Sequence, residues 1–310
     1  MGLVRSEPAE VPVAITLTQI RAFLAVKSAG SVHAAAGQLL VSQPSVSAAV
    51  AALAREVGTA LFERHGRGVR LTESGEAFAP YAAEVLGLLE QGRNAAQEAA
   101  YPEYSRVRLV AVNTAGEYLA PPLIQAHRRL HPGVNVLLEV GNRATVFERL
   151  ESGRADIGIG GRPAGRRLTG YPFVGNELIV VGREAPADLA RVPWLLREEG
   201  SGTRMATERL LADLDLGPAG GGAPELLTLG SNGAIKQGLV VGLGVTLISR
   251  FAVARELRDG ALCEIGVAGT PLTRPWHVLF PPSGPRRPAV RAFSEFLRSS
   301  QGQSVIEKLL

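Results

Sequence analysis

The chain has 310 residues, 46% apolar and 20% charged, which is the ordinary balance of a folded protein with room for two or three domains. No apolar run reaches the roughly eighteen residues of a membrane-spanning helix, so no membrane partner is expected. A single cysteine, Cys263, excludes an internal disulfide and a cysteine-rich metal site, and we expect no metal. Residues 1–15 lack an apolar core and are predicted to be a short tail rather than a signal peptide, which favours a cytoplasmic location.

The formal net charge of +4 is too small to indicate a nucleic-acid partner by itself, but its distribution is informative. Residues 16–72 hold six Lys or Arg against two Glu, whereas residues 73–103 hold one Arg against six Glu. A basic segment can neutralise phosphates and an acidic one cannot. We therefore predict a DNA-binding domain over residues 16–72, followed by a segment with a different task.

Three short helices are predicted within this basic domain. The first covers about residues 18–28 and is broken by Gly30, and the second covers about residues 31–40. A tight turn leads to a third helix, which begins with Ser-Gln-Pro at residues 42–44 and ends at Gly58. This is the helix-turn-helix arrangement, in which the second helix of the pair enters the major groove. The small and polar residues expected to contact DNA are Ser31, Ser42, Gln43, Pro44, Ser45 and Ser47.

Two strand-like pieces follow within residues 61–75, LFERHGRGVRLTESG, and the glycines between them supply a turn. They predict a β-wing beside the helix-turn-helix. The wing carries Arg64, Arg67 and Arg70, which we expect to contact the DNA backbone or the minor groove. The fold expected for residues 16–72 is thus a winged helix-turn-helix.

Residues 17–75 resemble the DNA-binding module of LysR-type transcriptional regulators. The family pattern matches almost throughout and has the form GS...AA..L..SQ..VS..I..LE..LG..LF.R..R...LT..G. Two positions depart from it, because Ala48 stands where a polar or basic residue is usual and Ala54 where a glutamate is usual. Fewer base contacts are therefore expected from the third helix, with more reliance on DNA shape and on the wing.

A long helix is predicted from about Glu73 to Ala100, with Thr72 as its N-cap. Its apolar and small residues recur in alternating three- and four-residue steps, which is typical of a coiled-coil seam: Phe78, Tyr81, Val85, Leu88, Gly92, Ala95 and Ala99. We interpret residues 73–104 as a dimerisation helix with its hinge, which the resemblance also implies. A helix packed only against its own domain is the alternative.

Residues 105–310 alternate strand-like and helical patterns. Strands RVRLVAV, VNVLLEV and ADIGIG with two intervening helices make a βαβαβ run, for which a parallel sheet is expected. A second alternating set follows, with one strand over FVGNELIVVG, and the chain closes with the strand PWHVLF and a helix. We predict an α/β fold of two sublobes, one over about residues 105–175 and 275–310 and the other over about 176–274, with a ligand cleft between them.

Three predicted helix starts face that cleft and combine hydroxyl or amide side chains with free backbone N–H groups, which is the chemistry of anion binding. Arg204 would add a full positive charge. The residues predicted to bind an effector are Asn113, Thr114, Asn142, Ser201, Gly202, Thr203, Arg204, Ser231 and Asn232. The alternative is that they are ordinary helix caps.

The segments GEYLAP, GRADIGIGG, GSGTR and LGSNGAIKQGLVVGLGVTLISR resemble the effector-binding domain of LysR-type regulators, which is similar to periplasmic binding proteins. They are closest to members that control carbon-fixation and sulfur-assimilation operons. The resemblance implies a small, often anionic or phosphorylated effector, although Asn113 replaces a commoner hydroxyl residue. It also implies double-stranded promoter DNA as a partner, a homodimer or dimer of dimers, and RNA polymerase as a further candidate partner.

Other functions fit parts of the sequence less well. An enzyme would need a nucleophile with its base or paired acids, but the five histidines are scattered, and no G-x-S-x-G, P-loop or H-E-x-x-H motif occurs. A solute-binding transport protein would need export, and a constitutive architectural DNA-binding protein would not need a cleft. We therefore predict an effector-modulated transcriptional regulator that is not an enzyme and has no catalytic residues and no cofactor.

Overall fold

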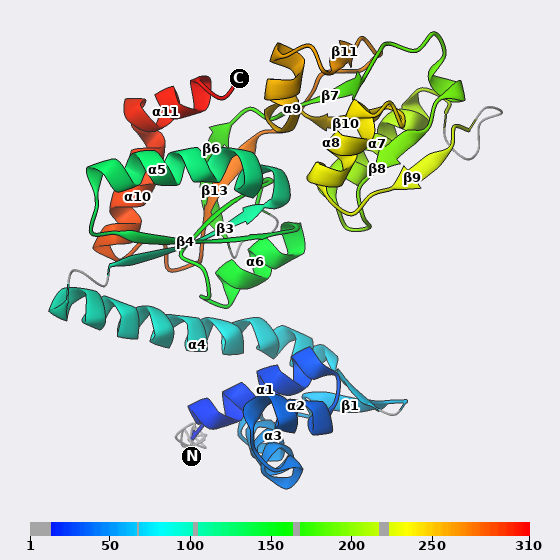
Figure 1. Cartoon of the computed structure of the whole chain (residues 1–310). Helices are drawn as coiled ribbons and strands as arrows, with labels where there is room; N and C mark the ends of the chain where they lie inside the picture. The colour runs from blue at the N-terminus through cyan, green and yellow to red at the C-terminus, as the bar shows by residue number, and fades with distance from the viewer. Residues whose placement is uncertain (1–13, 67, 102–104, 164–167, 217–222) are drawn as a thin grey trace, which may run out of the picture. The chain divides into compact units, whose positions relative to one another are not determined.

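The computed structural model describes residues 14–66, 68–101, 105–163, 168–216 and 223–310 (Figure 1). The chain divides into two compact units, Met1–Glu90 and Gln91–Leu310. Among the described residues, no single helix is long and apolar enough to cross a membrane. Arg67 and most of the predicted tail and hinge lie outside the described residues.

The amino-terminal unit forms the predicted helices, wing and start of the long helix. These elements are α1 (Leu17–Ala29), α2 (Val32–Leu39), α3 (Gln43–Val57), β1 (Phe62–His65), β2 (Gly68–Leu71) and α4 (Glu73–Ala100). Between α2 and α3 the chain bends by 108°, within the range of a helix-turn-helix. The side chains of Ser31 and Ser42 each accept a backbone N–H three residues further on, so both are N-caps.

Aromatic rings hold the core of this unit together. The Phe23 side chain is fully buried, and its ring centroid lies 5.2 Å from that of Phe62 and 5.4 Å from that of Phe78. These contacts join α1, the wing and α4 in one apolar cluster. Leu53 of α3 belongs to the same cluster, so the core also fixes the position of α3. A helix that reads DNA requires such a rigid support.

The carboxy-terminal unit contains a mixed sheet that we call sublobe I. Its strand order is β4-β3-β5-β13-β6, with bounds β3 (Arg106–Val112), β4 (Asn135–Gly141), β5 (Ile157–Gly160), β6 (Thr169–Val174) and β13 (Trp276–Phe280). The first three strands are parallel, as expected, but β13 runs antiparallel to both β5 and β6. The parallel arrangement expected for the βαβαβ run is confirmed, and the antiparallel strand arises because the chain leaves along β6 and returns along β13. The helical elements of this sublobe are η2 (Ala115–Leu119, a π-turn), α5 (Ala120–Leu130), α6 (Arg143–Glu151), α10 (Pro288–Arg298) and α11 (Ser300–Glu307).

Sublobe II is built around β7, with which β10, β11 and β12 all pair in the antiparallel sense. Its strands are β7 (Glu177–Gly182), β8 (Trp194–Leu196), β9 (Leu226–Thr228), β10 (Thr246–Ser249), β11 (Cys263–Ile265) and β12 (Leu272–Thr273). Its helical elements are η3 (Leu189–Arg191), α7 (Gly202–Asp213), α8 (Asn232–Val240) and α9 (Arg250–Arg258). The single strand predicted over residues 173–182 is in fact β6 and β7, which belong to different sheets. Two short crossovers, at residues 174–177 and 273–276, connect the sublobes.

Buried charges tie the last turns of α4 to sublobe I. Glu98 accepts a hydrogen bond from Arg287 Nη1 at 3.3 Å and another from the backbone N–H of Ala289, at the start of α10, at 3.0 Å. Arg287 also pairs with Asp156, which in turn pairs with Arg108 at 2.8 Å. Glu98, Asp156 and Arg287 are each less than 10% exposed. Neutralisation within the network is what makes so many buried charges tolerable.

A buried histidine of α5 has no hydrogen-bond partner for its ring among the described residues. His127 is fully buried, and neither of its ring nitrogens has a hydrogen-bond partner among the described residues. Its ring centroid lies 4.8 Å from that of Phe293 and 4.6 Å from that of His131. Burial, and secondarily the charge of His131, lower the pKa of His127 from 6.5 to about 4.

This histidine makes stability depend on pH. Below pH 6.5 an unfolded His127 takes up a proton, whereas the folded one does so only near its pKa of about 4. The unfolded state binds more protons in that window, so acidification from pH 6.5 to 4 should remove up to about 3 kcal/mol of stability. Urea titrations at several pH values should show a smaller loss for His127→Leu, whose side chain cannot titrate. Equal pH slopes in the two proteins would contradict the assignment.

Candidate effector cleft and DNA-contact surface

A cleft of about 450 Å³ lies between sublobes I and II. Sublobe I contributes the residues that follow β3, β4 and β5, and sublobe II contributes the start of α7. The crossover around Asn176 and the one that includes Arg274 complete the walls. Carboxyl ends of parallel strands and amino ends of helices therefore meet here, as in the ligand sites of other open α/β sheets.

Six of the nine residues predicted to bind an effector line this cleft: Asn113, Thr114, Asn142, Ser201, Gly202 and Thr203. Two of them are helix caps. Asn142 accepts the N–H of Thr145 at 2.9 Å to start α6, and Ser201 starts α7 in the same way. The caps orient the first turns of both helices towards the cleft, where unpaired backbone N–H groups favour a negative charge.

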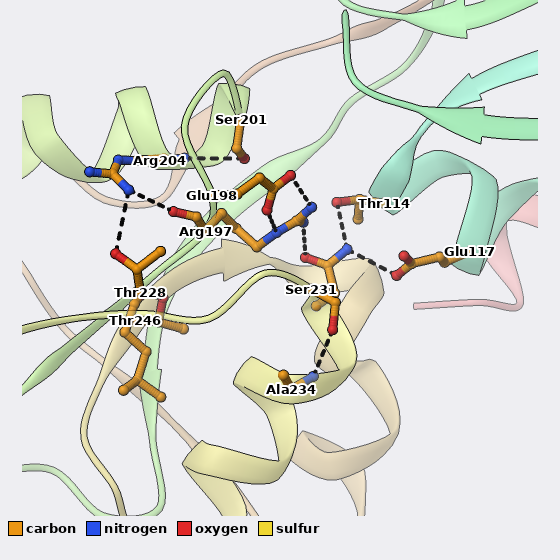
Figure 2. A network of polar contacts seen from close by, with 12 residues as sticks. Thr114, Glu117, Arg197, Glu198, Ser201, Arg204, Thr228, Ser231, Ala234 and Thr246 are labelled. Atoms are coloured by element: carbon orange, nitrogen blue, oxygen red, sulfur yellow. Dashed lines mark hydrogen bonds and ion pairs between the residues drawn. The ribbon is translucent and has the colours of Figure 1, made fainter. Parts of the chain in front are cut away.

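The other three predicted residues do not line the cleft in the structure. The guanidinium of Arg204 pairs with Glu208 at 2.8 Å. It also donates to the backbone carbonyl of Arg197 at 3.1 Å (Figure 2). Ser231 caps α8 by accepting the N–H of Ala234. Asn232 is 1% exposed and is bonded on all sides. The full charge that the sequence analysis gave to Arg204 must therefore come from elsewhere.

Four arginines that the sequence analysis did not select supply that charge: Arg143, Arg162, Arg197 and Arg274. His277 also lines the cleft, and none of the described residues that line it is an aspartate or a glutamate. Arg143 directly follows the cap of α6, and Arg162 comes two residues after β5. Both positions adjoin the end of a predicted strand or the start of a predicted helix. That position is the signal from which the sequence could have identified Arg143 and Arg162.

Most of this positive charge is not paired with a carboxylate among the described residues. Arg143 donates to the backbone carbonyl of Arg162 at 3.2 Å, and Arg274 donates to that of Gly202 at 2.9 Å. These acceptors are neutral, so both guanidinium charges persist. The side chain of Arg162 forms no hydrogen bond or ion pair with any other described residue, and Arg162 lines the cleft.

Arg197 differs because it is paired. It is 4% exposed and forms an ion pair with Glu198, with 2.7 Å between Nε and Oε2. Burial raises the pKa of Glu198, but the side-chain hydrogen bond from Arg197, a backbone hydrogen bond and the positive charge of Arg197 together bring the pKa below its ordinary value. Glu198 therefore stays ionised and compensates Arg197, which leaves Arg143, Arg162 and Arg274 as the uncompensated cations of the cleft.

Apolar side chains form the remaining wall: Val112, Leu178, Met205, Pro275 and Trp276. Met205 is 53% exposed although it is apolar, and Trp276 is nearly buried. A pocket with an apolar wall and a few convergent charged donors is suited to a small molecule with a carbon skeleton and charged ends.

The predicted DNA-contact residues gather at two exposed places in the amino-terminal unit. Ser42, Gln43, Pro44, Ser45 and Ser47 are all exposed around the first turns of α3, and Ser31 is half-buried. On the wing, Arg64 and Arg70 are exposed, and Arg70 pairs with Glu63 at 2.6 Å.

Comparison with known proteins agrees with this arrangement. Residues 17–76 match the bacterial regulatory helix-turn-helix protein, lysR family, and residues 102–302 match the LysR substrate binding domain. The HTH-type transcriptional regulator CfxR of Cupriavidus necator is 33% identical over 298 residues, 92% of this chain and 91% of its own. The RuBisCO operon transcriptional regulator of Acidithiobacillus ferrooxidans is 32% identical, over 91% of this chain and 93% of its own.

A solved structure extends the comparison to the cleft domain. The regulatory domain of CcmR from Synechocystis, in complex with 2-PG, is 27% identical with a TM-score of 0.53, and it covers 62% of this chain and 95% of its own. Two family domains in the expected order, and relatives above 30% identity over nine-tenths of the chain, identify its class. The chain belongs to the LysR-type transcriptional regulators, which are DNA-binding proteins with a carboxy-terminal effector-binding domain and not enzymes.

Proposed function

We propose that a small organic molecule with at least two anionic groups binds in the cleft and modulates promoter binding by this regulator. The observation that carries this proposal is the cleft wall, which has four arginines and no carboxylate among its described residues. One group would bind Arg143 and Arg162 of sublobe I, and another would bind Arg274 at the crossover and the start of α7. The complex of the Synechocystis relative with 2-PG supports a small ligand in such a domain.

Isothermal titration of the full-length chain tests this proposal. The probes are 2-PG and inorganic pyrophosphate, and the control is ribose, which is small and neutral. We expect both anionic probes to bind, with an affinity that falls as salt is raised, and ribose not to bind. Binding of ribose as tight as that of the anions would contradict the proposal, as would the absence of binding by either anion.

The proposed target is an operon of carbon fixation, because the RuBisCO operon regulator of Acidithiobacillus ferrooxidans is similar over nine-tenths of the chain. The regulator would act at promoter DNA in the cytoplasm and contact RNA polymerase there. Effector binding can shift the promoter-bound arrangement only by as much as its affinity differs between the two arrangements.

The proposed assembly is a dimer, or a dimer of dimers, paired along α4. The helix exposes an apolar stripe that water should not cover: Tyr81, Val85, Leu88 and Leu89 are each between 38% and 62% exposed. Their spacing matches a coiled-coil seam, so the occupant of the stripe should be α4 of a second copy.

Breaking that stripe should break the dimer. We expect Leu88→Glu to place a charge in the seam and to reduce the assembly to monomers at micromolar concentration, because a buried unpaired charge is costly. Light scattering after size-exclusion chromatography measures the mass. Glu76→Lys, a charge change at an exposed position of the same helix that does not share the face of the stripe, is the control. An unchanged mass for Leu88→Glu would show that the chain pairs elsewhere.

The two groups of DNA-contact residues should give different signatures. Arg64→Ala should weaken binding to every DNA sequence by a similar factor and lower the salt slope of log K by about one, because a wing arginine contacts phosphates. Arg70→Ala should have a smaller effect, because Glu63 already pairs with that charge.

Gln43→Ala, at the start of α3, should cost about 1–3 kcal/mol of binding free energy at one base position only. Fluorescence anisotropy with operator and scrambled DNA at several salt concentrations separates these outcomes, and a sequence-selective loss in Arg64→Ala would overturn the wing assignment.

A further inference from the structure

The side chain of Asn232, the first residue of α8, forms three hydrogen bonds in a buried position. Its three partners, Thr114, Glu117 and Arg197, are labelled in Figure 2. Its Oδ1 accepts from Arg197 Nη1 at 2.6 Å. Its Nδ2 donates to Thr114 Oγ1 at 3.3 Å and to Glu117 Oε2 at 3.0 Å. The amide therefore has a cation on one side and a hydroxyl and a carboxylate on the other.

These partners belong to different sublobes. Arg197 follows β8 and Asn232 starts α8, both in sublobe II, whereas Thr114 and Glu117 lie at the β3–η2 junction of sublobe I. Thr114 and Arg197 line the cleft, but Asn232 does not. Asn232 thus lies behind the cleft and connects a wall residue of one sublobe to a wall residue of the other.

A second contact across the sublobes also reaches Arg197. The amide of Asn113 satisfies both of its neighbours when its oxygen accepts from Arg197 Nη2 at 2.7 Å and its nitrogen donates to the Gly141 carbonyl at 3.1 Å. An arginine has five N–H donors. In Arg197, Nε and Nη2 then donate to Glu198, Nη2 also donates to Asn113, and Nη1 donates to Asn232. The remaining N–H on Nη1 is left for a ligand.

The hydrogen bond to Thr114 has a chemical consequence for the cleft. Because Asn232 donates to the Thr114 oxygen, the hydroxyl proton of Thr114 must point to another acceptor. Thr114 lines the cleft, so an anion there is such an acceptor. Asn232 in this way prepares Thr114 as a donor while it holds the guanidinium of Arg197 in place.

We propose that Asn232 is a positioning residue, which clasps the two sublobes together and presents Thr114 and Arg197 to an anion in the cleft. The inference rests on the proposed function, and it assigns to Asn232 an effect on ligand affinity without contact with the ligand. A primary amide is suited to this place because it accepts from a guanidinium and donates to two oxygens at once. Aspartate would lose both donors and face Glu117, and leucine would remove one hydrogen bond from each of the three partners.

The test is a titration of full-length variants with 2-PG and inorganic pyrophosphate. We expect Asn232→Leu to weaken binding about tenfold or more, although the residue does not line the cleft. The matched control is Ser231→Ala, which removes the neighbouring cap of α8 without touching the network, and its affinity should stay within about twofold of the native value. Equal losses in the two variants would overturn the proposal, because they would trace the effect to α8 alone.

A double-mutant cycle separates positioning from general destabilisation. If Asn232 acts through Thr114, Asn232→Leu should cost at least threefold less in a Thr114→Val chain than in the native one, because contacting residues are not additive. Losses that simply multiply would show that Asn232 acts independently of the hydroxyl and would overturn the proposal. If Asn232→Leu does not fold, Glu117→Ala takes its place in the titration and the cycle, because Glu117 is exposed and its loss removes one arm of the clasp.

A ligand-free measurement keeps the clasp distinguishable from the proposed function. If the native chain binds neither probe, the proposed function fails, and the clasp is then judged by hydrogen exchange alone. Asn232→Leu should speed exchange of the amides in η2 and in the first turn of α8, and leave β3 and β7 unchanged. Unchanged exchange in η2 would overturn the clasp, whatever the ligand proves to be.

Discussion

The paired substitution Arg143→Gln and Arg274→Gln is expected to weaken binding of 2-PG or pyrophosphate about a hundredfold or more. Both arginines line the cleft, one from the start of α6 and one from the crossover before β13. A hydrogen bond to a charged group contributes about 1.5–3 kcal/mol, so the loss of two corresponds to at least about two orders of magnitude in affinity.

Folding should survive this change. Arg143 donates to one backbone carbonyl and lies 4.8 Å from the centre of the Phe147 ring, and Arg274 donates to one backbone carbonyl. Neither forms an ion pair with a described residue, so the substitutions remove like charges rather than strand a buried partner. Thermal unfolding without ligand should be unchanged or slightly higher in temperature.

The control for this experiment is Arg204→Gln. Arg204 was the cation that the sequence analysis selected, but its guanidinium pairs with Glu208 and does not line the cleft. Isothermal titration of the two variants therefore separates two assignments of the same charge. Binding that is lost in Arg204→Gln and kept in the paired variant would show that the ligand lies beside α7 and not in the cleft.

The amino-terminal unit could be predicted from the sequence almost element by element, because its signals are local. Serine caps, a proline in the first turn of α3 and glycines after α1 and α3 define three short helices within forty residues or so. Which residues of this unit contact DNA is not a local property of the sequence. These depend on a partner that the amino-acid pattern does not contain, so the contact residues stay predictions.

The cleft was predictable only in part. Helix caps such as Asn142 and Ser201 can be identified from local residue spacing, and both line the cleft. The direction of a long side chain is set by its neighbours in space, and this is why Arg204 was selected although Glu208, one turn later, holds it away. Arg162 lies in the segment after β5, where no periodicity exists, so only the tertiary structure brings it to Arg143.

The sheet order needed long-range information. Residues 173–182 read as one strand because two apolar runs are joined by only Gly175 and Asn176. In the structure those two residues carry the chain from one sheet to the other, and β13 later returns beside β6 in the antiparallel sense. Strand pairing across a hundred residues leaves no trace in local hydrophobic patterns.

The second large effect is expected at the buried charge network that anchors α4. Arg287→Met should destabilise the carboxy-terminal unit by about 3–5 kcal/mol, because it leaves Glu98 and Asp156 as buried carboxylates without their shared cation. Asp156 would keep Arg108, but Glu98 would keep only the backbone N–H of Ala289. The exposed neighbour provides the control, since Arg286→Met should change stability by less than about 0.5 kcal/mol.

Denaturant titration followed by tryptophan fluorescence measures this loss in the correct unit, because both tryptophans of the chain, Trp194 and Trp276, lie in it. Adding Glu98→Gln should restore part of the stability, since it removes one of the two stranded charges. Full additivity of the two changes would mean that Glu98 is not held by Arg287. A coupled result would show that Arg287 holds Glu98 of α4 and Asp156 of sublobe I at the same time, so that one buried cation joins the last turns of the helix to the sheet domain.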